Sequence, residues 1–215
     1  MKKYLAAAGL WILIASASHA QTLVGYWDLN SNQSRSSGSS GLLSAELEGY
    51  GITYIGYGTG TTVNLEPGFS AGESLSFVNL ASIIEVGHVT VSGLNFTGLV
   101  APTFSFAARS NPAFQLGDVF KLEYNTGSGW TLETTLPTPN TSYAMVTRTF
   151  SSGILDGLPN VDIRITFSTV VAVADTFEVD NVKVTAVPEP ASLALFGLGG
   201  ALMLFRLHRK PDRHS

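Results

Sequence analysis

The 215-residue chain contains no cysteine. Disulfide cross-links, thiolate zinc sites and cysteine nucleophiles are therefore excluded, and burial and hydrogen bonds alone must hold the fold together. Charged residues are also scarce, at 13% of the chain, whereas hydrophobic residues make up 45%. A chain of this length and composition has room for one substantial domain or two small ones.

Basic residues are few in the middle of the chain. Between Gln21 and Val187 there are six lysines and arginines against fourteen aspartates and glutamates, and the other six basic residues lie near the two ends. Such an acidic surface repels polyanions. We therefore expect no nucleic-acid partner.

Histidine is nearly absent as well, because only His88 remains once the two terminal segments are set aside. A Ser-His-Asp site would need His88 as its base, and no Gly-x-Ser-x-Gly motif surrounds any serine. One histidine also excludes a multi-histidine zinc site. We expect a hydrogen-bonded or surface histidine and no catalytic residue.

The N-terminal segment has the pattern of an export signal. It begins with two lysines, continues as an apolar run from Leu5 to Ile14, and ends in small residues before Gln21. This pattern predicts a signal peptide over residues 1–20, which signal peptidase cleaves between Ala20 and Gln21. The alternative is a retained membrane anchor, for which the apolar run is short, since a spanning helix needs about 20 residues.

The C-terminal segment has three parts. Pro188, Glu189 and Pro190 come first, residues 191–205 carry no charge, and an arginine-rich tail follows. The apolar stretch predicts a single transmembrane helix over 191–207, with its basic tail in the cytoplasm and the body outside. The signal peptide predicts the same topology.

This arrangement over about residues 187–213 resembles the PEP-CTERM sorting signal of Gram-negative bacteria. The resemblance implies an inner-membrane tether and cleavage near Pro188-Glu189-Pro190 by the membrane enzyme exosortase. The cleaved body would then pass to the cell surface or the extracellular matrix. The two prolines also favour an extended, protease-accessible segment, because proline cannot continue a helix. The alternative is an ordinary single-span tail anchor.

The body, residues 21–186, has the period of two that is typical of strands. Apolar and polar residues alternate from Val161 to Phe167 and from Phe120 to Tyr124, and no stretch sustains a helical period. Glycine- and proline-rich turns separate the strands, which predicts an all-β, antiparallel β-sandwich or barrel with a bulge at Ser92-Gly93 and a surface loop over Ser31–Gly41. Strands are expected at 22–29, 52–57, 61–65, 74–78, 88–96, 104–108, 120–124, 130–135, 143–150, 161–167 and 176–185.

Two parts of the body resemble the jelly-roll and galactose-binding-like modules of secreted proteins. Residues 23–28 resemble their opening strand, and residues 177–184 resemble the closing strand that pairs with it. A hairpin of residues 122–124 and 129–131 resembles a central one in those modules. The resemblance implies a jelly-roll-like sandwich and carries no site residues.

Aromatic residues are the candidates for ligand contact, because their faces can stack on sugar rings. We select Trp130, which follows a Gly-Ser-Gly turn, and Trp27. The alternative is that the aromatic residues fill the core of the sandwich. The full set is Tyr26, Trp27, Tyr54, Tyr57, Trp130 and Tyr143.

Paired carboxylates support two further hypotheses. Glu46 with Glu48, or Glu178 with Asp180, could act as the acid and base of a glycoside hydrolase, although a solvated strand face has the same pattern. Alternatively, residues 175–181 together with Asp28 could hold a structural calcium ion, with Asp28 and Asp180 as ligands. No other cofactor is expected.

The sequence therefore predicts an exported, non-enzymatic protein of the cell surface or extracellular matrix, associated with exopolysaccharide or biofilm. Signal peptidase and exosortase are its expected processing enzymes. The alternatives are a carbohydrate-binding module and a secreted carbohydrate-active hydrolase that uses a carboxylate pair.

Overall fold

A computed structural model describes residues 20–30, 33–48, 54–78, 86–111, 119–168 and 176–189. Within these ranges every regular element is a strand, and all strand pairs are antiparallel. The strands are β1 (Thr22–Trp27), β2 (Ser37–Gly38), β3 (Leu42–Glu48), β4 (Tyr54–Thr59), β5 (Glu73–Val78), β6 (Val86–Leu94), β7 (Leu99–Asn111), β8 (Val119–Asn125), β9 (Thr131–Thr135), β10 (Ala144–Thr149), β11 (Val161–Ser168) and β12 (Thr176–Pro188).

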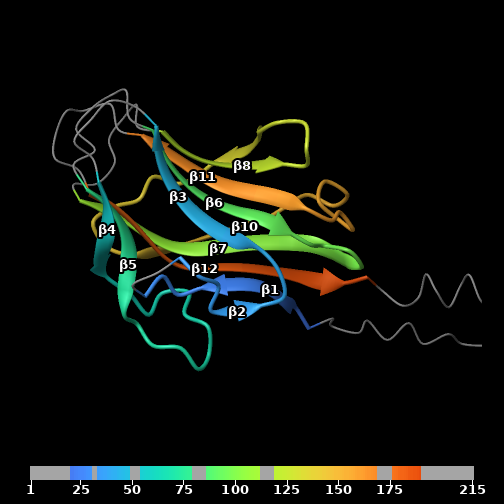
Figure 1. Cartoon of the computed structure of the whole chain (residues 1–215), viewed down its shortest axis with the longest axis horizontal. Helices are drawn as coiled ribbons and strands as arrows, with labels where there is room; N and C mark the ends of the chain where they lie inside the picture. The colour runs from blue at the N-terminus through green and yellow to red at the C-terminus, as the bar shows by residue number, and fades with distance from the viewer. Residues whose placement is uncertain are drawn as a thin grey trace, which may run out of the picture.

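The strands form two sheets that face each other (Figure 1). Sheet A has the order β10-β7-β12-β1-β2, and β5, with β4 outside it, pairs with the first part of β12. Sheet B has the order β3-β6-β11-β8-β9. The predicted all-β antiparallel sandwich is confirmed.

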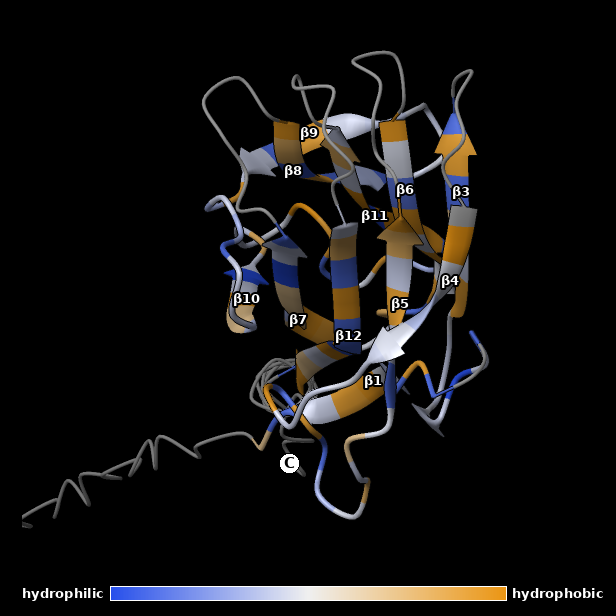
Figure 2. Ribbon diagram, turned by 90° about the vertical axis from the view of Figure 1, so that its left-hand side faces the viewer, coloured by the Kyte–Doolittle hydropathy of each residue, from blue (hydrophilic) through white to orange (hydrophobic). Residues whose placement is uncertain are grey.

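The core lies between the sheets and follows the alternation seen in the sequence. The apolar residues of β11, from Val161 to Phe167, are fully buried, as are Phe120 and Leu122 of β8. Figure 2 shows the alternating hydropathy along the strands. Aromatic rings join the two layers: the centroid of Phe167 in sheet B lies 4.1 Å from that of Phe177 in sheet A. Burial of these rings supplies much of the hydrophobic stabilisation.

The first and last strands are neighbours, as the jelly-roll resemblance implied. β1 pairs with β12, with Thr22 opposite Ala186 and Trp27 opposite Val182. The start of β1 and the end of β12 therefore lie side by side at one end of sheet A (Figure 1). The expected hairpin also forms, between β8 and β9.

Three parts of the strand prediction are wrong. β2 lies within the predicted surface loop of Ser31–Gly41, where Ser37 and Gly38 pair with Tyr26 and Gly25 of β1. Residues 61–65 form turns, because side chains of β12 hold this segment in a loop. β3 was not predicted, although Leu43 is buried and Leu47 packs against the core. Every other expected strand overlaps a strand of the structure, and the bulge at Ser92-Gly93 is confirmed by a register shift there.

The terminal segments lie mostly outside the described residues. Residues 1–19 and 190–215 are not described, so the signal peptide and the transmembrane helix over 191–207 stay predictions. In the described part of the chain, no helix is long and apolar enough to cross a bilayer.

Candidate functional site

The chain enters its C-terminal segment directly from the last strand. β12 continues through Pro188, two residues beyond the predicted domain boundary at 186, and Pro188 lies opposite Leu99 of β7. The Glu189 N–H donates a hydrogen bond of 2.9 Å to the Gly98 carbonyl oxygen. The segment is extended, as expected, and Glu189 is exposed, but the backbone of Pro188 and Glu189 is docked on sheet A rather than free.

The predicted signal-peptidase site lies at the same end. Ala20 and Gln21 are both exposed. The Gln21 side-chain oxygen accepts a 3.3 Å hydrogen bond from the hydroxyl of Thr185 in β12. The two ends of the body, which the sequence predicts to be cleaved, thus meet on adjacent strands.

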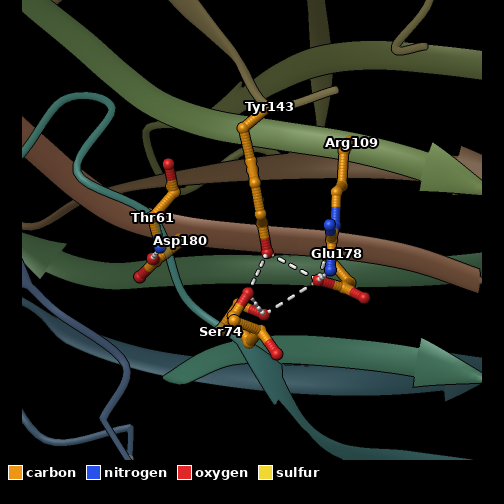
Figure 3. A network of polar contacts seen from close by, with 7 residues as sticks. Thr61, Ser74, Arg109, Tyr143, Glu178 and Asp180 are labelled. Atoms are coloured by element: carbon orange, nitrogen blue, oxygen red, sulfur yellow. Dashed lines mark hydrogen bonds and ion pairs between the residues drawn. The ribbon is translucent and has the colours of Figure 1, made fainter. Parts of the chain in front are cut away.

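A partly buried ion pair joins Arg109 of β7 to Glu178 of β12 in sheet A (Figure 3). Glu178 is 8% exposed, and its Oε2 atom accepts hydrogen bonds from Arg109 Nε at 2.9 Å, Ser74 Oγ at 3.0 Å and the Tyr143 hydroxyl at 2.6 Å. The Arg109 guanidinium carbon also lies 4.5 Å from the Tyr143 ring centroid. Burial and the bond to Glu178 raise the pKa of Tyr143 above its usual range. Sequence reasoning found Glu178 but missed Arg109 as its partner.

Asp180 lies two residues further along β12, on the same face, and is 1% exposed. Its Oδ2 accepts the Thr61 N–H at 2.8 Å, and its Oδ1 accepts the N–H of Asn181 at 2.7 Å. Burial raises the pKa of Asp180 to about 7, assisted by the negative charges of Asp28 and Glu178 and opposed by the two backbone bonds. A carboxyl group with a raised pKa can serve as the acid of an acid–base pair.

Both carboxylates, however, are largely buried and accept hydrogen bonds from protein donors. Asn181, at φ 49°, continues this network: its Nδ2 donates to the carbonyl oxygens of Thr61 at 2.7 Å and Val63 at 3.0 Å, and its Oδ1 accepts the Tyr26 hydroxyl at 2.6 Å. Burial raises the pKa of Tyr26 to about 12. Asp180 and Asn181 therefore fasten the loop of residues 60–72 to sheet A.

The proposed calcium ligands, Asp28 and Asp180, already accept hydrogen bonds from backbone N–H groups. Asp28 Oδ1 accepts the Asn30 N–H at 3.4 Å, and both oxygens of Asp180 are used. Among the described residues, no group of three or more histidine, aspartate or glutamate side chains is arranged to hold a metal ion. Calcium prefers six to eight oxygen ligands, which these two carboxylates do not approach.

Trp27 is not available to a ligand, so that part of the site prediction is wrong. Its side chain is fully buried, and a Cβ atom at Gly25 would overlap its ring. The reason is a bulge between Leu23 and Gly25, which turns Trp27 towards the core together with Val24. Tyr26 is also covered, with the Phe69 ring centroid 4.9 Å from its own.

Trp130, in contrast, lies at the surface of sheet B with 37% of its area exposed. The Arg164 guanidinium carbon lies 4.1 Å from its ring centroid, and Arg164 Nε donates to Glu123 Oε2 at 2.8 Å. The Glu123 carboxylate is buried, and its hydrogen bonds with Thr166 and Arg164 outweigh desolvation and lower its pKa. A cation stacked on one face of the indole leaves the ring firmly oriented.

His88 belongs to the same network and has no catalytic geometry. The Thr166 hydroxyl donates to Glu123 at 2.5 Å, so its oxygen accepts from His88 Nδ1 at 3.0 Å. The other ring nitrogen lies 3.6 Å from Glu48. Burial and the nearby charge of Arg164 lower the pKa of His88, which keeps the ring neutral at physiological pH.

A groove of about 350 Å³ opens on sheet B beside Leu42 and Asp162. It runs from β3 across the β6 bulge to β11 and carries the exposed Leu42 at one side and Asp162 at the other. Asp162 Oδ1 holds the bulge by accepting the Gly93 N–H at 2.9 Å. The lining residues are Arg35, Gly41, Leu42, Ser92, Gly93, Asn160 and Asp162.

Comparison with protein families decides the nature of the C-terminal segment. Residues 186–210 match the PEP-CTERM protein-sorting motif. The predicted sorting signal is thereby confirmed. The motif implies an exported protein that an exosortase processes, membrane-anchored at first and then at the cell surface or outside the cell.

Comparison with solved structures finds similar chains at low sequence identity. The chain is similar to the xylan-binding CBM22-1 domain of Paenibacillus barcinonensis Xyn10C, with 9% identity, TM-score 0.47 and coverage of 80% of this chain and 99% of that one. It is also similar to a family 11 carbohydrate-binding module of Clostridium thermocellum in complex with a mixed-linked tetrasaccharide. The identity is 13%, the TM-score is 0.44, and the match covers 78% of this chain and 99% of that one.

A third similarity is to the enzymatically active domain of the bacteriophage CBA120 tailspike protein 4, with 11% identity and TM-score 0.47. It covers 67% of this chain and only 19% of the tailspike chain. A comparison with curated protein sequences finds no match.

Proposed function

We propose that this is a non-enzymatic protein of the cell surface or extracellular matrix that associates with exopolysaccharide, as in a biofilm. The observation that carries the proposal is the sorting motif at 186–210, which begins within the last strand of an otherwise self-contained sandwich. Because Thr22 pairs with Ala186, the two expected cleavage points lie at one end of the body. The rest of the sandwich can then project away from the membrane.

The burial of three of the candidate catalytic groups supports a non-enzymatic role. His88 is buried with Nδ1 hydrogen-bonded. Glu178 and Asp180 are buried and already accept hydrogen bonds from neighbouring side chains and amides. A reacting group must reach its substrate at hydrogen-bond distance, which these positions do not offer.

We place the polysaccharide contact on the outer face of sheet B, between Leu42 and Trp130. Both side chains are exposed, at 76% and 37%, and the groove with Arg35 and Asp162 lies beside Leu42. Leu42 is on β3, and Trp130 packs over Arg164 of β11, two strand positions away, so the face between them is about 10 Å wide at the usual strand spacing. Apolar contacts flanking fixed polar groups suit an extended sugar chain.

Titration of the purified body with a polysaccharide panel that includes the exopolysaccharide of the native host tests this. We expect saturable binding that Trp130→Ala and Leu42→Ser each weaken at least tenfold. Tyr57→Ala is the matched control, since Tyr57 is an exposed aromatic residue on edge strand β4 of sheet A. Equal losses in all three variants, or no binding to any polysaccharide, would contradict the proposed glycan contact.

One observation favours the hydrolase alternative: Asp180, whose pKa is raised, lies two residues from Glu178 on β12. Release of new reducing ends can be followed in the same mixtures. We expect none from the wild-type body. Release that Glu178→Gln abolishes, while binding is kept, would establish the hydrolase instead.

A further inference from the structure

We infer that exosortase processing leaves strand β12 whole, because the fold protects every bond up to Glu189 and the cut lies on the C-terminal side of that residue. The inference rests on the proposed function, since it concerns the processing of the same sorting motif. Its starting point is an overlap: the motif covers 186–210, whereas β12 ends at Pro188. The first residues of the sorting motif are therefore also part of sheet A.

The shared residues are held by their neighbours on β7. Ala186 is fully buried in the core, Val187 lies opposite Val100, and Pro188 lies opposite Leu99. The Glu189 N–H then closes the pairing with its 2.9 Å bond to Gly98 O. The chain is fixed to the sheet up to Glu189.

The part of β7 that receives them is braced from the other side. Gly157 N–H donates to the Leu99 carbonyl oxygen at 2.9 Å. The Asp156 carboxylate accepts the Ala101 and Gly153 N–H groups, each at 2.8 Å. Asp156 thus stabilises the left-handed backbone of Ala101, at φ 50°. We call residues 98–101, with the Asp156 and Gly157 contacts that brace them, the corner; the first residues of the sorting motif pair with it.

This corner decides which peptide bonds an enzyme can reach. In hydrolysis the oxygen of water bonds to the carbonyl carbon, the C–N bond breaks, and the released nitrogen takes up the proton, so the enzyme must surround that carbonyl and stabilise its oxyanion. Backbone paired within a sheet is closed to such an approach unless the region first opens locally. The bond after Glu189 is the first one beyond these pairs.

The predicted membrane helix begins close to the end of β12, so the pairing of β12 with β7 also limits where the motif can move. Only Glu189 and Pro190 separate β12 from the apolar stretch that begins at 191, a span of about 7 Å when fully extended. The folded body would lie almost against the membrane, where exosortase acts. Access to the motif should therefore depend on how firmly the corner holds the end of β12.

The C-terminal residue of the mature protein, determined by mass spectrometry of the full chain processed in its native host, tests the inference. We expect the mature chain to end at Glu189 or later. An end at Pro188 or earlier would overturn the inference while leaving the proposed function intact. An uncut tail would instead overturn the proposed function.

A pulse-chase comparison of two matched variants tests the role of the corner. Asp156→Ala removes the acceptor that braces the corner, whereas Asp162→Ala removes an acceptor of the same kind at the bulge in sheet B. We expect processing several-fold faster in Asp156→Ala only. Equal rates in both variants and the wild type would overturn the restraint.

A Gly-Ser-Gly-Ser insertion between Val187 and Pro188 tests the same point without changing either carboxylate. It keeps Pro188, Glu189 and Pro190 together but moves them off the sheet, and we expect several-fold faster processing. The same insertion after Gly127, in the exposed β8–β9 turn, is the control. Rates that do not differ between the two insertions would overturn the claim that the sheet restrains access to the motif.

Discussion

The Arg164 guanidinium carbon lies 4.1 Å from the ring centroid of Trp130, while Arg164 Nε donates to Glu123 at 2.8 Å. One cation therefore orients the exposed indole and neutralises a buried carboxylate. The stacking contact and the ion pair should have very different energies, because the indole is partly exposed and the carboxylate is not.

Substitution at the two positions separates these roles. We expect Trp130→Ala to lower the free energy of unfolding by about 1 kcal/mol, the upper range for an exposed cation–π contact. Arg164→Ala should cost about 3 kcal/mol, because it removes the nearest cation from the buried Glu123 carboxylate and leaves only the Thr166 hydroxyl and, at 3.8 Å, Lys121. Urea denaturation measures both values. Adding Glu123→Gln to Arg164→Ala should recover part of the lost free energy of unfolding. A double variant less stable than both single variants would contradict the pairing.

The raised pKa of Asp180 predicts a stability that falls as the pH rises. In the unfolded chain this carboxyl titrates near 3.8, whereas its pKa in the folded protein is about 7. The folded state therefore binds the proton more tightly, so the contribution is complete below about pH 4 and is lost between about pH 4 and 7, by at most about 1.4 kcal/mol per pH unit.

Urea denaturation of the wild type and Asp180→Asn across this range isolates the effect. His88 acts in the opposite direction, because its lowered pKa removes stability as the pH falls below 6.5. The two proteins share His88, so the difference between their curves reports on Asp180. We expect Asp180→Asn to be less stable at pH 5 and closer to the wild type at pH 8. Parallel curves would contradict the raised pKa.

The sequence predicted most strands because one face of each is buried. Alternation in Val161–Phe167 survives in β11, and the opening and closing strands pair as the jelly-roll resemblance implied. β3 has the same alternation of buried and exposed residues, with Glu46 and Glu48 on the exposed face. Its local pattern is therefore sufficient to predict a strand.

Long-range contacts explain the parts that local pattern could not supply. The loop at 61–65 has strand-like composition, yet its backbone is bound by Asn181, about 120 positions away in sequence. The burial of Trp27 depends on a bulge in β1, which the local sequence does not predict. The partnership of Arg109 with Glu178 likewise requires β7 and β12 to lie side by side.

Gly87 is a position where one methyl group should disturb the core. It lies opposite Phe167, and a Cβ atom there would overlap the phenyl ring. We expect Gly87→Ala to destabilise the fold by about 1–3 kcal/mol, since overpacking forces neighbours from their preferred positions. Thermal denaturation measures the loss. In a Phe167→Leu background the cost of Gly87→Ala should shrink, and additive costs would contradict the proposed overlap.

Chelation tests the calcium hypothesis at Asp28 and Asp180. Because both Asp180 oxygens accept backbone N–H groups, we expect EDTA to leave the Tm of the purified body unchanged. Calorimetry with and without EDTA measures this. A Tm that falls with EDTA, recovers with calcium but not magnesium, and becomes insensitive in Asp28→Asn would establish the metal site.

The central claim is that a sandwich domain is exported and then released through its C-terminal sorting motif. Intact mass of the protein recovered from the surface and medium of the native host tests it most directly, beside a variant with Pro188, Glu189 and Pro190 changed to alanine. We predict that the wild type begins at Gln21 and lacks the C-terminal apolar segment, while the variant retains that segment. A tail that stays intact in both proteins would contradict the account and leave a simple membrane-tethered domain.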